Sequence, residues 1–322
     1  MGKDNKSNPL HRIYKSSTFG IVMILLVMCT FIAVLSDKFL TTDNLLSVFR
    51  AFSFVAIMAI GECLVIITGG IDLSVSSIFA FSGVISAMAM VQWGLPVPLA
   101  IMIGMAAGVA FGFANGIFIT KLKLPPFIAT LGILSIARGL SYGITGGYPI
   151  PDFPASFKFI GQGYIGIIPF PVILLILLGI IFSIFLRSTV FGRRIYAIGG
   201  NEEAARVSGI NTDRTKIIVY CLSGLLAGIA GMATAARLGV AQSTAGMGYE
   251  LDTIAAVIIG GTSVSGGVGT VFGAIIGAAI MGVLRNGLIL LNVSAYWQQT
   301  VIGCVIILAV SADQLRYIRA KK

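Results

Sequence analysis

Apolar residues occur in long, nearly uninterrupted runs along most of the chain, and short polar segments separate them. Two clear runs are GIVMILLVMCTFIAVL (20–35) and IGIIPFPVILLILLGIIFSIFL (165–186). A helix needs about 20 apolar residues to cross the hydrocarbon core of a bilayer, and these runs approach or reach that length. The alternating pattern of membrane β-strands is absent. The sequence therefore predicts an all-α polytopic membrane protein.

The same pattern predicts about ten transmembrane helices, some of them short or broken. The segment 251–263 is too short to cross a bilayer alone. The first apolar run is longer than the ~7–15 residues of a signal-peptide core, and no A-x-A site closes it, so we expect a retained span. The predicted spans are 18–36, 48–68, 72–91, 95–120, 126–146, 165–186, 215–236, 251–263, 265–284 and 296–312.

Charge gives these spans an orientation. The 322-residue chain is 57% hydrophobic and 11% charged, with a net charge of +10. With the N-terminus in the cytoplasm, 16 of the 22 Lys and Arg residues fall in cytoplasmic segments and five fall outside, as the positive-inside rule requires. A basic excess spread over short loops argues against nucleic-acid binding. We predict cytoplasmic tails at 1–17 and 313–322, a transmembrane domain at 18–312 and a large cytoplasmic loop at 187–214.

Glycine and hydroxyl residues indicate close helix packing and interrupted helices. Four glycines recur at every fourth position and share one helix face, which lets a neighbouring backbone approach closely. The segments GGIDLSVSS (69–77) and GGTSVSGGVG (260–269) each join a Gly-Gly pair to hydroxyl residues at the edge of an apolar run. Paired interruptions of this kind lie on the substrate route of many transporters. The four glycines are Gly104, Gly108, Gly112 and Gly116.

Three charged residues, Glu62, Asp72 and Arg138, lie within or at the edge of predicted spans. A charge at this depth is expected to pair, to cap a helix or to contact a substrate. Asp72 precedes an apolar helical run, as an N-cap residue does. Capping or structural pairing is therefore the favoured interpretation for Asp72, with substrate contact as the alternative.

Signatures of enzymes and cofactor sites are nearly absent from the sequence. The single histidine, His11, lies in the N-terminal tail, which excludes histidine-based acid–base catalysis or metal binding in the spans. GLSYG (139–143) matches G-x-S-x-G, but Ser141 lacks the strand–turn–helix context of a nucleophile. No P-loop motif occurs, so we expect no bound ATP, metal or other cofactor in this chain. Four cysteines without metal spacing are predicted to be buried free thiols; they are Cys29, Cys63, Cys221 and Cys304.

The stretch AIGGNEEAARVSGIN (197–211) is unusually polar for this chain. Asn201 suits an N-cap, and the two glutamates that follow would lie in the first turn, where the helix dipole favours negative charge. Gly209 fits the position just after the last helical turn. A helix of about two turns is unstable alone, so this one is predicted to pack on a further surface.

The same stretch carries the resemblance to a known family. Glu203, Ala204, Ala205 and Gly209 form an EAA-x3-G sequence that resembles the core of the cytoplasmic loop in permeases of ABC importers. The isoleucine followed by Leu-Pro that completes this signature in other branches is missing. GGIDLSVSS, PPFIATLGILSIARGL, KIIVYCLSGLLAGIAG and TAGMGYELDTIAAVIIGGTSVSGG are similar to the ribose/xylose-type sugar permeases. The similarity covers about residues 40–312 and is strongest towards the ribose-transporting members.

The resemblance implies partners that composition does not show. Two permease subunits, as a homodimer in a bacterial inner membrane, would form the pathway. A tandem-domain ABC ATPase would bind ATP and Mg on the cytoplasmic face, and an extracytoplasmic sugar-binding protein would dock at 237–250. Candidate docking residues are Gln242, Tyr249 and Glu250. Candidate residues for coupling to the ATPase are Gly199, Gly200, Asn201, Glu202, Glu203, Ala204, Ala205, Arg206, Ser208 and Gly209.

A sugar is neutral and rich in hydroxyl groups, so its pathway is expected to be polar with few charges. The candidate pathway residues are Glu62, Asp72, Ser74, Ser76, Ser77, Asn115, Thr262 and Ser263. Because the binding protein supplies most of the selectivity in such systems, allose, xylose, inositol or a furanose signal molecule are alternatives to ribose. A secondary transporter is an alternative of another class, in which Glu62 and Asp72 would bind the coupling ion. A channel or scaffold would explain neither the polar loop helix nor the interrupted segments.

Overall fold

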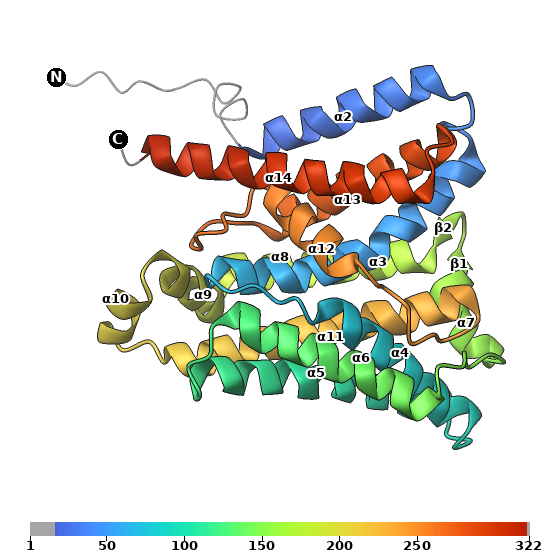
Figure 1. Cartoon of the computed structure of the whole chain (residues 1–322), viewed down its shortest axis with the longest axis horizontal. Helices are drawn as coiled ribbons and strands as arrows, with labels where there is room; N and C mark the ends of the chain where they lie inside the picture. Colours follow the sequence, from blue (N-terminus) through green and yellow to red (C-terminus); the bar gives the residue numbers. More distant parts are fainter. Residues whose placement is uncertain (1–16, 321–322) are drawn as a thin grey trace.

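The structure, a computed structural model, describes residues 17–320 and is built almost entirely of helices (Figure 1). In chain order the elements are α2 (Ser17–Leu35), α3 (Thr42–Ile67), α4 (Val75–Val91), α5 (Val97–Thr120), α6 (Pro126–Thr145), α7 (Ala155–Gln162), β1 (Tyr164–Ile165), β2 (Ile168–Pro169), α8 (Phe170–Ser188), α9 (Val190–Gly200), α10 (Glu202–Val207), α11 (Thr212–Leu238), α12 (Tyr249–Ile259), α13 (Val271–Leu290) and α14 (Ala295–Ala320). The predicted tail residues 1–16 and 321–322, with His11, lie outside the described residues.

Six helices in the described part of the chain are long and apolar enough to cross a membrane: α3, α5, α6, α8, α11 and α13. Shorter apolar stretches lie in α2, α4 and α14. The eighth predicted span, 251–263, corresponds to α12, whose 11 residues reach about 16 Å at about 1.5 Å per residue. That is about half of a hydrocarbon core. The polytopic all-α class is therefore confirmed, while the count of ten crossings and the side of the membrane on which each terminus lies stay predictions.

Two short helices each follow an irregular segment, the arrangement expected of an interrupted crossing. Residues 68–74 lead from α3 into α4, and residues 239–248 lead from α11 into α12. In Figure 1, α4 and α12 both begin in the interior of the molecule and run towards opposite ends. Both segments that the sequence singled out contain irregular backbone: one lies between α3 and α4, and 260–269 lies between α12 and α13. The segment 239–248, which was expected to be an outside loop, is a further irregular segment before a short helix.

Close helix packing holds the centre of the bundle together. In α3, 83% of the most apolar window is buried, so this helix forms the core on which α8, α11, α12 and α13 pack. A Cβ atom on Gly108 or Gly112 of α5 would overlap the backbone carbonyl oxygens of Gly224 or Tyr220 on α11. The predicted glycine row is thus confirmed as a surface of direct backbone contact between two helices.

Three predicted boundaries shift in the structure. The loop 187–214 holds two helices, α9 and α10, where the sequence predicted one helix. The predicted span 165–186 begins only at Phe170, because the preceding residues form the β1–β2 hairpin around Gly166, which has a φ of +62°. The last helix continues to Ala320, so most of the predicted tail 313–322 is helical. The first residue of α2, the last residue of α14 and the α9–α10 pair lie at the same end of the molecule (Figure 1).

The four cysteines are free, as predicted, but they do not share one environment. Cys63 is fully buried, Cys29 and Cys221 are half-buried, and Cys304 is exposed. The expectation that all four are buried was wrong for Cys304, because α14 turns this residue to the surface of the chain. Ser141 lies within helix α6, and its hydroxyl donates to the carbonyl of Ala137. The G-x-S-x-G match therefore has no nucleophile geometry.

Candidate functional site

The predicted polar loop helix forms with the caps that its sequence specifies. In α10 the side-chain oxygen of Asn201 accepts a hydrogen bond from the amide of Ala204 at 2.9 Å. At the other end Gly209 has a φ of +84°, its amide donates to the carbonyl of Arg206, and the amide of Ile210 donates to Ala205 at 3.1 Å. This is the Schellman arrangement, which satisfies the last carbonyls of a helix.

One face of α10 is attached to the bundle, and the other face is free. Glu202 accepts a hydrogen bond at 2.6 Å from Lys216 of α11, and Ala205 is buried. Glu203, Ala204 and Arg206 are exposed, and Val207 is 81% exposed. This face of α10 is therefore open to another surface.

Three glycine-rich segments meet where α9 ends, and we call this contact the glycine junction (Gly69, Gly199, Gly200, Gly266 and Gly267). The amide of Gly267 donates to the carbonyl of Ile67 at 2.9 Å. A Cβ atom on Gly199 would overlap that same carbonyl oxygen and the amide of Gly267, whereas a Cβ on Gly200 would meet nothing within 4 Å. The junction therefore joins α9 to the end of α3 and to the loop 260–270 through direct backbone contact.

Tyr196 reinforces this junction from within α9. Its hydroxyl donates to the carbonyl of Gly269 at 2.7 Å. Burial raises the pKa of Tyr196, and the nearby Cys63 adds to the effect, so the hydroxyl remains a donor at neutral pH. The α9–α10 pair is thus linked to both Gly-Gly segments that the sequence singled out.

Arg138 of α6 connects the two interrupted crossings. Its guanidinium donates to the carbonyls of Ser243 and of Ala245, the latter at 2.9 Å, and to the carbonyl of Ser76 at 3.3 Å. Phe79 of α4 and Tyr249 of α12 contact edge to face nearby, with ring centroids 5.8 Å apart. One half-buried cation therefore binds the irregular backbone of 239–248 and the first turn of α4.

Half of the candidate pathway residues form a buried polar cluster. Asp72 accepts hydrogen bonds from the Ser74 amide at 3.0 Å and from the Ser223 hydroxyl at 3.0 Å. Its own amide donates to Glu62 at 3.1 Å, and Asn115 donates to Ser74 at 2.8 Å. The side chain of Asp72 thus fixes the turn that leads into α4. It does not cap the helix, because Ser74 is the N-cap residue and no side chain accepts a hydrogen bond from the first amides there. Glu62, Asp72, Ser74 and Asn115 have no exposed surface in this chain.

The remaining candidates lie apart from this cluster. Ser76 and Thr262 are buried, and the hydroxyl of Thr262 lies 3.5 Å from the sulfur of Cys63. Ser263 is half-buried in the loop after α12. The structure therefore gives most of the candidates partners within the chain and leaves their contact with a substrate as a prediction.

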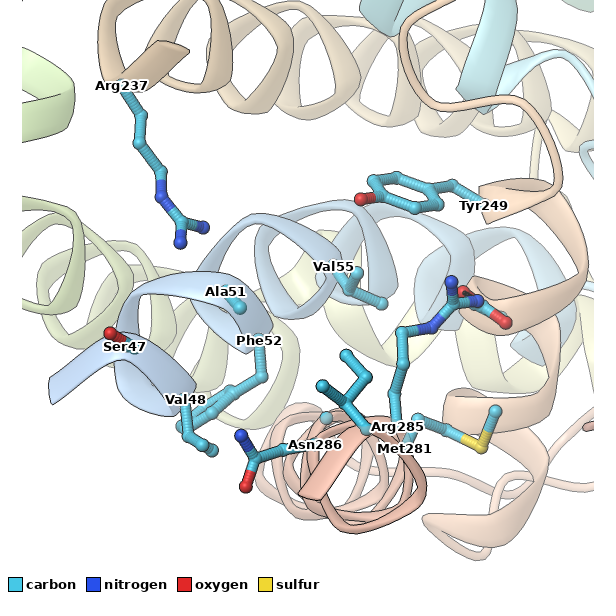
Figure 2. Close-up of a pocket in the computed structure, with 13 residues that line it drawn as sticks. Ser47, Val48, Ala51, Phe52, Val55, Arg237, Tyr249, Met281, Arg285 and Asn286 are labelled. Carbon is cyan, nitrogen blue, oxygen red and sulfur yellow. Dashed lines mark hydrogen bonds and ion pairs between the residues drawn. The ribbon is translucent and has the colours of Figure 1, made fainter. Parts of the chain in front are cut away.

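A cleft between α3, α11, α12 and α13 carries polar groups that face open space, and we call it the Arg237–Arg285 cleft. Its volume is about 230 Å³. Figure 2 shows Arg237 and Arg285 reaching into it from different helices, with the ring of Tyr249 along one wall and Asn286 below. Arg285 forms an ion pair with the buried Asp252 and lies 5.9 Å from the centroid of the Tyr249 ring.

The three predicted docking residues differ in how exposed they are. Gln242 is exposed on the segment 239–248, whereas Tyr249 is half-buried against the Arg237–Arg285 cleft. The Glu250 side chain has a buried oxygen without a hydrogen-bond partner among the described residues. Gln242 is therefore the candidate with the most freedom to meet another protein.

Sequence reasoning missed two features of this region. It noted Arg138 as a charge within a span but gave it no partners, because carbonyl acceptors leave no trace in side-chain patterns. It missed the Arg237–Arg285 cleft altogether, since its residues come from four helices. The one available signal was two basic residues, Arg237 and Arg285, at the ends of spans with few charges.

Comparison with known proteins places this architecture among transport proteins. Residues 44–310 match the family described as "Branched-chain amino acid transport system / permease component". The chain is 45% identical to the ribose import permease protein RbsC of Bacillus subtilis (strain 168), over 92% of each chain. It is 44% identical to RbsC of Escherichia coli (strain K12), over 91% of this chain and 92% of that protein. The D-allose transport system permease protein AlsC of Escherichia coli (strain K12) is 39% identical, over 94% of this chain and 92% of that protein.

Proposed function

Because the chain belongs to this family of transport-system permease components, we propose that it is the membrane-spanning subunit of an ABC importer that carries ribose into a bacterial cell. The observation that carries the proposal is the identity of 45% to a ribose import permease over 92% of the chain. The family description names branched-chain amino acids, but these relatives are named for sugars. Allose and xylose remain alternatives as cargo, and permeases named for allose, galactose and xylose are 39%, 36% and 35% identical to this chain.

We further propose a division of labour among several subunits. Two copies of this chain would enclose the pathway in the inner membrane. A tandem-domain ATPase would seat α10 at the cytoplasmic end, and a sugar-binding protein would dock at the opposite end, near Gln242. The support in this chain is the free face of α10, with Val207 81% exposed, and the absence of any P-loop motif from the sequence.

The geometry supports a route for coupling. Coupling requires an element whose position both partners influence. Movement of α10 would be passed to α9, and from Gly199 through the glycine junction to the end of α3 and the loop 260–270. The junction borders residues 68–74, and Arg138 ties α4 to 239–248. Both interrupted crossings would therefore respond to the ATPase.

The Arg237–Arg285 cleft is better placed than the buried cluster to receive a monosaccharide. Arginine, carboxylate and amide groups offer the paired hydrogen bonds that sugar hydroxyls take, and the ring of Tyr249 provides an apolar face. The Asp72 cluster has no exposed surface. Glu62 and Asp72 would then serve the fold of α4 rather than bind a coupling ion.

Reconstitution tests this function directly. Proteoliposomes that contain the chain, its ATPase and its binding protein should accumulate radiolabelled ribose only with internal ATP, and leucine should not accumulate. The control is the same vesicle without the ATPase, with a proton or sodium gradient imposed. Ribose uptake driven by that gradient alone would refute the ABC assignment, and leucine uptake would refute the sugar assignment.

Charge reversal on α10 should disconnect the permease from the ATPase. Glu203→Lys places a positive charge in the first turn, where the helix dipole already repels it, and on the free face that would enter the ATPase. We expect ATP-driven uptake and co-purification of the ATPase to fall at least tenfold, while membrane insertion stays normal. Gly209→Leu, which forces a side chain into a φ of +84°, should act in the same direction.

The matched control for Glu203→Lys is Asp43→Lys. Asp43 is also an exposed acidic residue in the first turn of a helix, but it belongs to α3 at the other end of the molecule. This variant should keep its ATPase. Equal loss in both variants would show a general effect of charge and contradict the proposed seat for α10.

A further inference from the structure

A second cleft lies beside the α9–α10 end of the molecule, between α8, α9 and α13, and we call it the Arg187–Arg193 cleft. It encloses about 510 Å³. Ser183, Leu186 and Arg187 line it from α8, Arg193 and Tyr196 from α9, and Thr270, Val271 and Phe272 from the start of α13. None of these residues belongs to the sites described above except Tyr196, whose hydroxyl holds the carbonyl of Gly269.

The cleft has a positive charge that no acidic group in the described part of the chain balances. Within residues 17–320, neither the Arg187 nor the Arg193 guanidinium has a hydrogen-bond or ion-pair partner, and both side chains are exposed. The sequences of α8, α9, the loop 260–270 and α13 contain no Asp or Glu. The first amides of the 20-residue helix α13 add their dipole to the same side of the cleft.

The remaining wall of the cleft is apolar and continues along the membrane-spanning helices. Leu186 and Val271 are buried at its base, and Phe272 is 53% exposed at its edge. Ile184, on the same turn of α8, is 57% exposed. The two arginines therefore lie at the point where the apolar surfaces of two spans end, which is the depth of lipid headgroups.

We propose that the Arg187–Arg193 cleft binds the phosphate headgroup of an anionic phospholipid from the leaflet on the α10 side. Guanidinium groups bind phosphate oxygens in pairs, and basic pockets between spans on the cytoplasmic side recognise such headgroups. The acyl chains would follow Phe272 and the exposed face of α8. Because α9 forms one wall, the lipid would stabilise the position of α9 relative to α13 and hence the glycine junction.

Lipid titration followed by native mass spectrometry tests this proposal on the purified full-length chain. With palmitoyl-oleoyl phosphatidylglycerol we expect retained lipid at concentrations at least fivefold below those needed with phosphatidylcholine. The double variant Arg187→Gln/Arg193→Gln should lose this preference. The control Arg214→Gln, another exposed arginine at the same end that does not line the cleft, should keep it. Thermal unfolding of each variant in detergent will show that the double variant is folded, as expected for two exposed side chains.

Four outcomes would overturn the proposal. The first is equal binding of the two lipids by the wild-type chain, and the second is an unchanged preference in the double variant. The third is that the same substitutions weaken capture of the ATPase while phosphatidylglycerol binding is unaffected, which would assign the arginines to that subunit. The fourth is that inorganic phosphate, titrated in the same way, binds with the affinity of phosphatidylglycerol. The site would then recognise free anions, and the lipid proposal would fail.

Discussion

Gly199→Ala is expected to abolish ATP-driven ribose uptake, whereas Gly200→Ala, one residue along the same helix, should leave uptake within about twofold of wild type. The methyl group at Gly199 would overlap the carbonyl oxygen of Ile67 and the amide of Gly267, which are backbone atoms with little freedom to move. Overpacking of this kind costs about 1–3 kcal/mol or forces the backbone apart. At Gly200 the same methyl group meets nothing within 4 Å.

The measurement is uptake in proteoliposomes, together with ATPase activity and co-purification of the ATPase. For Gly199→Ala we expect the ATPase still to bind, because α10 and its caps do not touch the substituted position, while ATP hydrolysis no longer depends on the sugar-loaded binding protein. That combination separates a broken connection from a failure to assemble. Normal uptake by Gly199→Ala, or equal loss in both variants, would show that the glycine junction does not carry the coupling.

The helices and the loop helix α10 could be predicted from the sequence because their signals are local. Apolar runs locate the spans, and Asn201 and Gly209 specify the ends of α10 through bonds to residues three or four positions away. The glycine row of α5 was predictable for the same reason, since its spacing alone places it on one face. In each case the signal and the structure that it specifies lie within about one or two helical turns.

The irregular segment 239–248 was not predicted, because contacts with residues far away in the sequence determine its position. RLGVAQSTAGMGYE is short and polar, and by composition it resembles a loop. Its position depends on residues about 100 positions earlier in the chain: Arg138 donates to its carbonyls, Ser141 accepts from the Ser243 hydroxyl, and Ile150 pairs with Ala241. The glycine junction could not be predicted from the sequence for the same reason. Gly69, Gly199 and Gly266 lie far apart in the sequence and meet only when their three segments fold together. Sequence patterns predict the helices, but hydrogen bonds between distant residues decide where the irregular segments pack against them.

Arg138→Leu should reduce ribose uptake at least tenfold while the protein still inserts in the membrane. The substitution removes the donors for the carbonyls of Ser243, Ala245 and Ser76 at once, and a buried acceptor without a donor costs about 1–3 kcal/mol. Arg138→Lys should be intermediate, because a compact ammonium group cannot span two segments as the planar guanidinium does. The segment 239–248 would then lose its bond to α4 and would keep only the bonds of the Ser243 hydroxyl to Ser141 and Thr145 of α6 and the bridge between Ala241 and Ile150.

Hydrogen exchange measured by mass spectrometry distinguishes this cause from a general loss of stability. In Arg138→Leu, exchange of the amides in 239–248 should accelerate, while those in α5 and α11 should be unchanged, since that packing rests on the glycine row. The control is Ser135→Leu, an exposed residue on the same helix whose hydroxyl bonds only the carbonyl of Leu131; it should match wild type in uptake and exchange. Lost uptake with unchanged exchange in 239–248 would give Arg138 a role other than holding that segment, and normal uptake would remove it from the mechanism.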